Sequence, residues 1–275
     1  MKLSPHWLPH HKSAQDIAWF RTWNPPSVKI VWSGIPPYLD ELGLPDSCLL
    51  VIRDYPITEN YGQRGIRDLA QAKAMGVTHA AAYKAIAQGI RDRYSILPGR
   101  LLFESLNEPQ DQAGGNEPPA LVAAYNVSFL VEMHKAGLRS VVGNWGVGHP
   151  DNHGEREAAP DWLQYQSIIG AMHPNDFLGL HEYWSLAGIQ DGWLWWAGSF
   201  LQCPYDVPLM VTEVGIDNAV KGGPHQGWHD LPGAMHDRAV RYTNELMSYE
   251  LALQRDKRVH SAHIFSHDTS TVEWD

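Results

Sequence analysis

The chain contains only two cysteines, Cys48 and Cys203, and they lie far apart in the sequence. This does not indicate a disulfide framework, so we expect buried or free thiols, with a single disulfide left open. No apolar run approaches the roughly 18 residues that a membrane-spanning helix needs. The first residues, MKLSPHWLPHHK, lack the apolar segment of a secretory signal. We therefore expect a soluble chain, extracellular only if a leader has been removed.

Several catalytic signatures are also missing. No glycine-rich phosphate loop follows an early apolar run, which disfavours a dinucleotide-binding fold. No G-x-S-x-G nucleophile elbow occurs. The chain has 15 histidines but no helical His-x3-His pair, and its densest His and acid cluster, HPDNHGERE (149–157), is typical of a loop. We therefore expect no metal and no cofactor, although a structural cation in that loop stays open.

The acidic balance and the tryptophan content bear on partners. A formal charge of −10 argues against nucleic acid and anionic membranes, but not against a neutral substrate such as a sugar. The 12 tryptophans indicate either a large aromatic core or a groove whose rings stack on sugars, and the count alone does not separate the two. We expect a monomer that binds an oligo- or polysaccharide.

Apolar, β-branched runs alternate with helical periodicity along the chain. The predicted strands are 2–8, 28–32, 48–53, 100–107, 139–145, 177–184, 208–215 and 261–267, the first weakened by Pro5. The predicted helices are 14–22, 60–75, 79–94, 118–136 and 234–254, with Gly76 and Gly137 as helix caps. Eight strands in 275 residues predict one α/β domain over 1–275, a (β/α)8 TIM barrel. The sequence stops soon after the eighth strand, so either the sequence is truncated or the last helix is absent.

The tripeptide Asn-Glu-Pro occurs twice, in different contexts. Glu108 in RLLFESLNEP ends a predicted strand, where barrels carry their functional residues. Glu117 follows two glycines and opens a helix, so Asn116-Glu117-Pro118 is interpreted as a helix cap. A second strand, PLMVTEVG, ends on Glu213. Two carboxylates facing each other across a barrel mouth can cleave a glycosidic bond.

These strand ends resemble those of the retaining glycoside hydrolases of clan A, which are (β/α)8 barrels. FESLNEP matches their fourth strand, VTEVG their seventh, and the His-x-Tyr of FLGLHEYW their sixth. The resemblance implies that Glu108 is the acid/base and Glu213 the nucleophile. It implies that Asn107 binds the hydroxyl next to the anomeric carbon, that Tyr183 donates to the nucleophile, and that His181 contacts substrate or the acid/base. No family within the clan is assigned.

Two further charged groups are candidates for supporting roles. Arg53 ends the third predicted strand. The resemblance implies an Arg near the nucleophile, which would lower the pKa of Glu213; the alternative is a structural ion pair of Arg53 with Asp54 or Glu104. Lys29 and Glu104 lie within predicted strands, where a charge is costly unless paired. We expect these two to form a paired layer beneath the site.

Aromatic residues near strand ends complete the expected site. We expect Trp32, Trp145, Trp184 and Trp274 to contact substrate. For Trp274 this follows from the resemblance, which implies a Trp beneath the reacting sugar after the eighth strand. The segment GWLWWAGSF (192–200) is either a sugar platform or, with more support, a buried helix face.

Together these features predict a retaining β-glycosidase, acting within a polysaccharide such as a β-1,4-glucan, mannan or xylan. Three alternatives stay open. They are a carbohydrate-binding barrel without catalysis, a metal-dependent hydrolase on the same fold, and a glycosidase that cleaves peptidoglycan.

Overall fold

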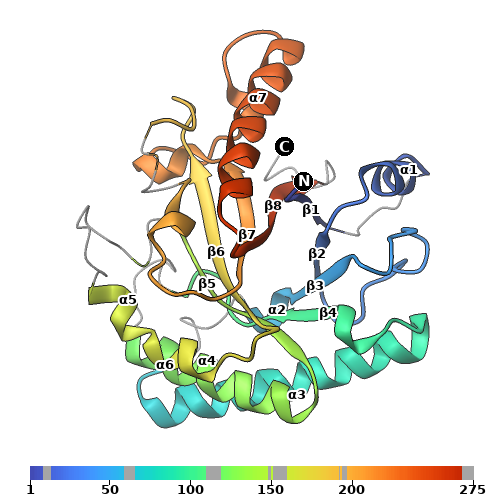
Figure 1. Cartoon of the computed structure of the whole chain (residues 1–275), viewed down its shortest axis with the longest axis vertical. Helices are drawn as coiled ribbons and strands as arrows, with labels where there is room; N and C mark the ends of the chain where they lie inside the picture. The colour runs from blue at the N-terminus through green and yellow to red at the C-terminus, as the bar shows by residue number, and fades with distance from the viewer. Residues whose placement is uncertain are drawn as a thin grey trace.

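The computed structural model describes residues 1–8, 14–58, 66–109, 119–147, 150, 160–191, 193 and 197–267. Eight parallel strands form a closed barrel in sequence order, with β8 pairing β1 (Figure 1). The strands are β1 Leu3–Trp7, β2 Ser27–Trp32, β3 Leu49–Asp54, β4 Leu101–Glu104, β5 Arg139–Trp145, β6 Phe177–Trp184, β7 Leu209–Ile216 and β8 Val259–His267. The predicted (β/α)8 barrel is confirmed. Pro5 is accommodated within β1, whereas β4 is shorter than predicted.

Helices surround the barrel between most of its strands. They are α1 Ala14–Trp23, α2 Tyr55–Thr58, α3 Leu69–Tyr94, α4 Pro119–Lys135, α5 Pro160–Gln164, α6 Gln166–Ala171 and α7 Met235–Arg255. Short 3-10 helices are η2 Pro98–Arg100, η3 Ser199–Gln202, η4 Asn218–Lys221 and η5 Trp228–Asp230. The connection from β2 to β3 (33–48) contains turns and no helix. The question of a last helix after β8 stays open, because residues 268–275 lie outside the described residues.

The prediction that Gly76 ends a helix is wrong. Residues 69–94 form the single helix α3, and Gly76 lies inside it. A Cβ at position 76 would lie 2.5 Å from the backbone oxygen of Tyr125 and 3.0 Å from the backbone nitrogen of Phe129. The glycine therefore permits close packing of α3 on α4, which lie side by side in Figure 1. Gly137 does follow a helix as predicted, with a φ of 68°.

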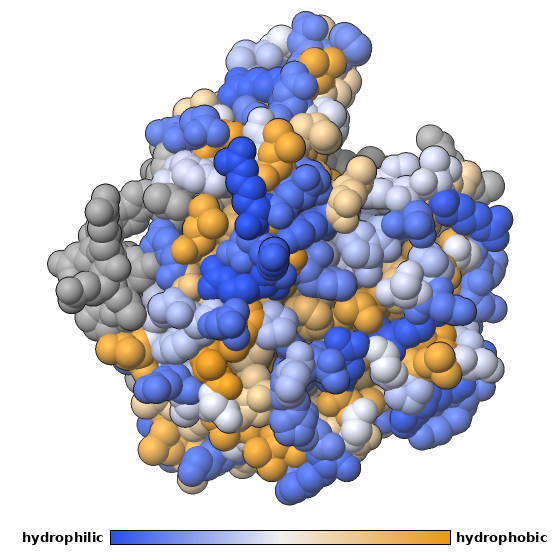
Figure 2. All heavy atoms as spheres, viewed as in Figure 1, coloured by the Kyte–Doolittle hydropathy of each residue, from blue (hydrophilic) through white to orange (hydrophobic). Residues whose placement is uncertain are grey.

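Two apolar layers hold the barrel. A small inner cluster takes one residue from each of β3 to β7, namely Val51, Leu102, Val141, Phe177 and Met210. A much larger cluster lies between strands and helices. On the face in Figure 2, hydrophobic and hydrophilic side chains are intermixed. The inner cluster closes the amino-terminal half of the barrel, so the carboxyl ends of the strands are left for charged groups.

Two further expectations can be checked against the described residues. Cys48 and Cys203 are both buried and both free, as expected. No helix among the described residues is long and apolar enough to cross a membrane.

Candidate active site

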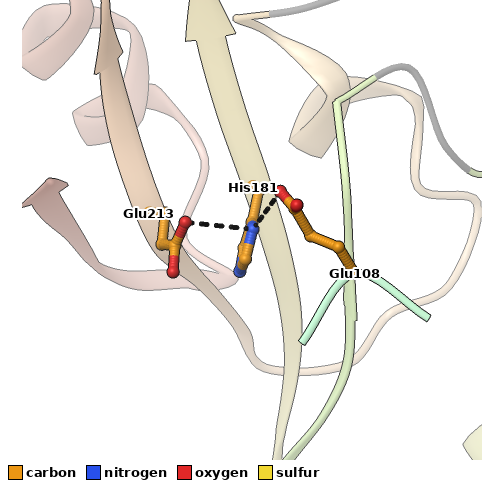
Figure 3. A group of neighbouring side chains, drawn as sticks. All are labelled: Glu108, His181 and Glu213. Atoms are coloured by element: carbon orange, nitrogen blue, oxygen red, sulfur yellow. Dashed lines mark hydrogen bonds and ion pairs between the residues drawn. The ribbon is translucent and has the colours of Figure 1, made fainter. Parts of the chain in front are cut away.

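Charged side chains meet at the carboxyl ends of the strands. Glu108 follows β4, His181 lies on β6 and Glu213 on β7, and Figure 3 shows the imidazole between the two carboxylates. His181 Nδ1 is 2.7 Å from Glu108 Oε1 and 3.3 Å from Glu213 Oε2. One oxygen of each carboxylate and one ring nitrogen lie within 4.8 Å of one another. The two glutamates singled out in the sequence therefore face each other.

The carboxylate of Glu213 has a partner on every side. Its Oε1 accepts from Lys29 Nζ at 2.9 Å and from Arg53 Nη1 at 2.5 Å. Its Oε2 accepts from the hydroxyl of Tyr183 at 2.7 Å and faces His181. Only 4% of Glu213 is exposed. The expected contacts of Arg53 and Tyr183 with Glu213 are thus present, from β3 and β6.

These partners fix the charge of Glu213. Burial alone would favour the neutral acid, but the positive charges of His181, Lys29 and Arg53 hold the pKa of Glu213 well below its usual range. Burial, together with the charge of Glu213, raises the pKa of Tyr183 well above its usual value. Tyr183 therefore remains a hydrogen-bond donor, and Glu213 remains an ionised carboxylate.

Lys29 and Glu104 form the expected paired layer beneath the site. Lys29 Nζ lies 3.1 Å from Glu104 Oε1, and both side chains are fully buried. Burial opposes ionisation of Glu104, but Lys29, His181 and Arg53 together outweigh it and lower the carboxyl pKa. Lys29 also contacts Glu213, so this ion pair is part of the site rather than a separate support.

His181 carries a positive charge at neutral pH. Burial would lower its pKa, but the carboxylates of Glu213, Glu104 and Glu108 raise it to about 9. Its Nε2 lies 4.0 Å from Glu104 Oε1, which is too long for a hydrogen bond, so this contact is a charge interaction. The protonated ring bridges the acidic groups of the site.

Glu108 has a different environment. Its side chain is 30% exposed, and its backbone is in the left-handed region, with a φ of 39°. Its N–H donates to the main-chain oxygen of Asn144 at 3.1 Å. The neighbouring Asn107 has a buried Oδ1 with no hydrogen-bond partner among the described residues. An incoming hydroxyl group would satisfy this acceptor.

Glu108, His181 and Glu213 are close enough to hold a metal ion. However, Lys29 and Arg53 already occupy Oε1 of Glu213, and the protonated imidazole of His181 has no lone pair to offer. The charges therefore disfavour a cation here. The cluster proposed in the loop 149–157 lies outside the described residues, apart from Pro150.

Two of the four predicted substrate-binding tryptophans do not face the site. Trp145 is fully buried against Trp162 and Tyr165, and Trp184 is fully buried against Tyr242 and Tyr249. Because successive side chains alternate in a strand, His181 and Tyr183 of β6 face inward and Trp184 faces the helices.

The remaining predicted site residues are either partly exposed at the mouth or outside the described residues. Trp32 ends β2 at the mouth and is partly exposed, so it remains a prediction. Trp274 and the second Asn-Glu-Pro (116–118) lie outside the described residues. Most of GWLWW (192–196) does as well.

Phe265 is an aromatic residue at the site that the sequence patterns above do not single out. Phe265 of β8 lies edge-on to Tyr183, with ring centroids 5.7 Å apart, and 5.0 Å from the ring of His6. Ser261 and His263 face the barrel interior, where both lie near Ser27. Because alternate residues of a strand face the same side, inward-facing Ser261 and His263 would have placed Phe265 inward as well, at the mouth of the barrel.

No protein-family model matches the sequence, and no curated protein matches it. The fold is similar to that of a β-mannanase from Streptomyces thermolilacinus with mannohexaose, with 17% identity and a TM-score of 0.53, covering 100% of this chain and 80% of that one. It is also similar to a GH128 (subgroup II) endo-β-1,3-glucanase from Pseudomonas viridiflava, with 18% identity and a TM-score of 0.52, covering 99% and 89%. At such identities the likeness establishes the fold.

Proposed function

We propose that the chain is a retaining β-glycosidase that cleaves within a β-linked polysaccharide. The observation that carries this is the pair Glu108 and Glu213: one oxygen of each carboxylate and a nitrogen of His181 all lie within 4.8 Å of one another. Retaining glycosidases place their carboxyl groups about 5 to 5.5 Å apart, and inverting enzymes place them about 6.5 Å apart or more. The short separation supports attack by a carboxylate rather than by an intervening water.

In the first step, Glu213 attacks the anomeric carbon and forms an ester bond as the glycosidic C–O bond breaks. Its ionised state and its aim depend on Lys29, Arg53 and Tyr183. Glu108 gives its proton to the departing oxygen, and its partial exposure leaves room for that group. Asn107 Oδ1 accepts from the hydroxyl beside the reacting carbon, a bond that tightens in the transition state.

In the second step, the Glu108 carboxylate takes a proton from water, and that water attacks the anomeric carbon. The bond to Glu213 breaks, and the sugar leaves with its original configuration. His181, hydrogen-bonded to Glu108 at 2.7 Å, orients this carboxyl group in both steps, and the proton taken from water restores the acid. The mechanism requires no cofactor.

The similar folds guide the choice of substrate. One belongs to a β-mannanase, which favours the mannan already expected, and another to an endo-β-1,3-glucanase, so β-1,3-glucan joins mannan, β-1,4-glucan and xylan as a candidate. We propose that Trp32, Tyr183 and Phe265 form the wall against which the reacting sugar packs.

A mutational comparison tests this function. Purified chain, Glu108→Gln and Glu213→Gln are assayed for new reducing ends on mannan, β-1,3-glucan, β-1,4-glucan, xylan and peptidoglycan. We expect cleavage of one plant or fungal polymer and a loss of at least about a thousandfold in each variant. NMR of the first product should show the β-anomer before mutarotation.

The alternatives give other results. Binding to a polymer without cleavage would indicate a carbohydrate-binding barrel. Cleavage of peptidoglycan alone would select the cell-wall substrate, and a first product with the α-anomer would exclude retention. Activity that EDTA abolishes would favour the metal-dependent hydrolase.

A further inference from the structure

Two strands of the barrel carry an extra residue at the same level, on either side of β6. In β5, Gly143 pairs with Gly179 and Trp145 pairs with Leu180, so Asn144 is the extra residue. In β7, Val211 pairs with Leu180 and Glu213 pairs with His181, so Thr212 is the extra residue. Each bulge changes which side chains face inward.

The bulge in β7 decides the direction of the nucleophile. Met210 belongs to the inner apolar cluster, and Val211 belongs to the cluster between strands and helices. In a regular strand, Glu213 would share the outward face of Val211. Thr212 shifts the alternation by one, so Glu213 faces the mouth of the barrel and contacts Lys29.

The bulge in β5 acts in the same way. Val141 belongs to the inner cluster, so regular alternation would turn Asn144 outward and Trp145 inward. In the structure Trp145 packs between strands and helices, and Asn144 is fully buried with a φ of 48°. The bulge therefore also explains why the predicted sugar contact of Trp145 is wrong.

The two extra residues contact each other across β6. Thr212 Oγ1 donates to Asn144 Oδ1 at 3.3 Å, and the main-chain oxygen of Leu180 at 3.4 Å shares the same proton. The strand between them carries Gly179 at this point, and a Cβ there would lie 1.9 Å from Asn144 Oδ1. Only glycine leaves room for the side chain of Asn144 to pass over β6 and reach β7.

Asn144 also holds the segment that carries the other carboxylate. Its main-chain oxygen accepts the N–H of Glu108 at 3.1 Å, and its side-chain Nδ2 donates to the oxygen of Val141 at 3.3 Å. Asn144 thus bonds to Glu108 itself on one side and to the residue preceding Glu213 on the other.

We propose that Asn144 is a positioning residue that sets the separation of Glu108 and Glu213, acting through the Asn144–Thr212 hydrogen bond. This inference rests on the proposed function for its catalytic consequence, because a retaining mechanism tolerates only a narrow range of carboxyl separations. A displacement of about 1 Å can lower a catalytic rate by roughly a hundredfold. The acid/base is the group most affected, since its backbone is held by Asn144 and its side chain is partly exposed.

The test uses Asn144→Gly, which tolerates the positive φ and keeps the carbonyl that Glu108 needs, while removing the side chain. Thr212→Val removes the donor, and Thr212→Ser keeps it. Ser140→Ala is the matched control, because Ser140 is buried on the same strand and its hydroxyl has no partner among the described residues. The substrates are phenyl and 2,4-dinitrophenyl β-glycosides of mannobiose, cellobiose and laminaribiose.

Protonation by Glu108 matters for the phenyl leaving group and hardly at all for dinitrophenolate. We therefore expect Asn144→Gly and Thr212→Val to lower kcat/KM by about tenfold to a hundredfold on the phenyl glycoside and by less than about threefold on the dinitrophenyl glycoside. Thr212→Ser should restore most of the activity, and Ser140→Ala should match the parent. Equal losses on both leaving groups would overturn the proposal.

A second readout needs no activity. Imidazole NMR follows the titration of His181, identified by the signal lost in His181→Asn, because Glu108 is one of the groups that raise the His181 pKa. Asn144→Gly should move this titration to lower pH, whereas an unchanged midpoint would overturn the positioning role. If the parent cleaves neither these glycosides nor any of the polymers, the proposed function fails and this titration still decides the inference.

Discussion

Glu213 and Glu108 are the same chemical group in two different environments. Glu213 lies within β7, is 4% exposed, and receives hydrogen bonds or charges from β2, β3 and β6. Glu108 follows the short strand β4 and has a side chain that is 30% exposed. Among the described residues, its carboxylate bonds to His181 alone. One carboxylate is enclosed by the barrel, and the other stands at its rim.

The difference matches the two tasks that the proposed mechanism assigns. A nucleophile has to stay ionised, and cations on several strands ensure this for Glu213. An acid/base has to gain and lose a proton in each cycle, which a site with fewer charges and access to water permits. The asymmetry therefore supports assigning the nucleophile to β7 and the acid/base to β4. It also predicts that equivalent substitutions will have unequal effects on stability.

The largest expected effect is that both glutamate substitutions abolish activity, whereas only one of them strongly lowers stability. Glu213→Gln and Glu108→Gln should both lower kcat by at least about a thousandfold. Only Glu213→Gln should also lower the free energy of unfolding, by about 3 kcal/mol, because Lys29 and Arg53 lose a buried counter-charge. Glu108→Gln should lower it by only about 1 kcal/mol, because the contact of Glu108 with His181 is partly exposed. Denaturant unfolding measures the free energy of unfolding of both variants. Equal values for the two variants would contradict the difference between the two environments.

The next effect concerns Lys29, whose ammonium group contacts both Glu213 and Glu104. Lys29→Met keeps the volume but leaves Glu104 buried without its ion-pair partner, so we expect a loss of about 3 to 5 kcal/mol. The pKa of Glu213 should rise, so the acid limb of kcat/KM should move to higher pH. Adding Glu104→Met should recover much of the stability. Lys84→Met, which breaks a partly exposed pair with Glu132, serves as the control and should cost under about 1 kcal/mol.

The charge of His181 should make stability depend on pH. Its pKa is about 9 in the folded chain and 6.5 in the unfolded chain, so the folded state binds the proton more tightly. The resulting stabilisation, about 3 kcal/mol, is fully present below pH 6.5 and is lost as pH rises through 9. Denaturant unfolding between pH 6 and 10 should show this slope. His181→Gln should lose it, while the exposed His225→Gln should keep it; a persistent slope in His181→Gln would contradict the assignment.

The sequence predicted the barrel and the facing glutamates because both depend on local patterns. Alternating strands and helices specify the fold, and a strand end specifies the mouth. The contacts of Arg53 and Tyr183 with Glu213 followed from the resemblance. The pairing of Lys29 with Glu104 followed from the cost of an unpaired buried charge.

The errors arose where a residue's direction depends on its neighbours in space. Trp145 was assigned to the mouth, but a bulge at Asn144 turns it toward the helices. Gly76 resembled a helix cap, but contact with α4 decides its role. Bulges and helix contacts involve strands and helices distant in sequence, so a period of two or 3.6 residues cannot reveal them.

The smallest expected effect tests which aromatic residues belong to the exposed side of the site. Tyr55 follows Asp54 at the end of β3 and is 57% exposed, whereas Trp184 is fully buried behind β6. Tyr55→Ala should raise KM for the polymer by about threefold to tenfold with little change in kcat, because a stacking face for sugar is lost. Tyr55→Phe should keep the parent KM. Trp184→Phe should lower the melting temperature and leave KM unchanged. A raised KM in Trp184→Phe with none in Tyr55→Ala would mean that substrate approaches from the β6 side, and the rim around Glu108 would no longer be the face that receives the polymer.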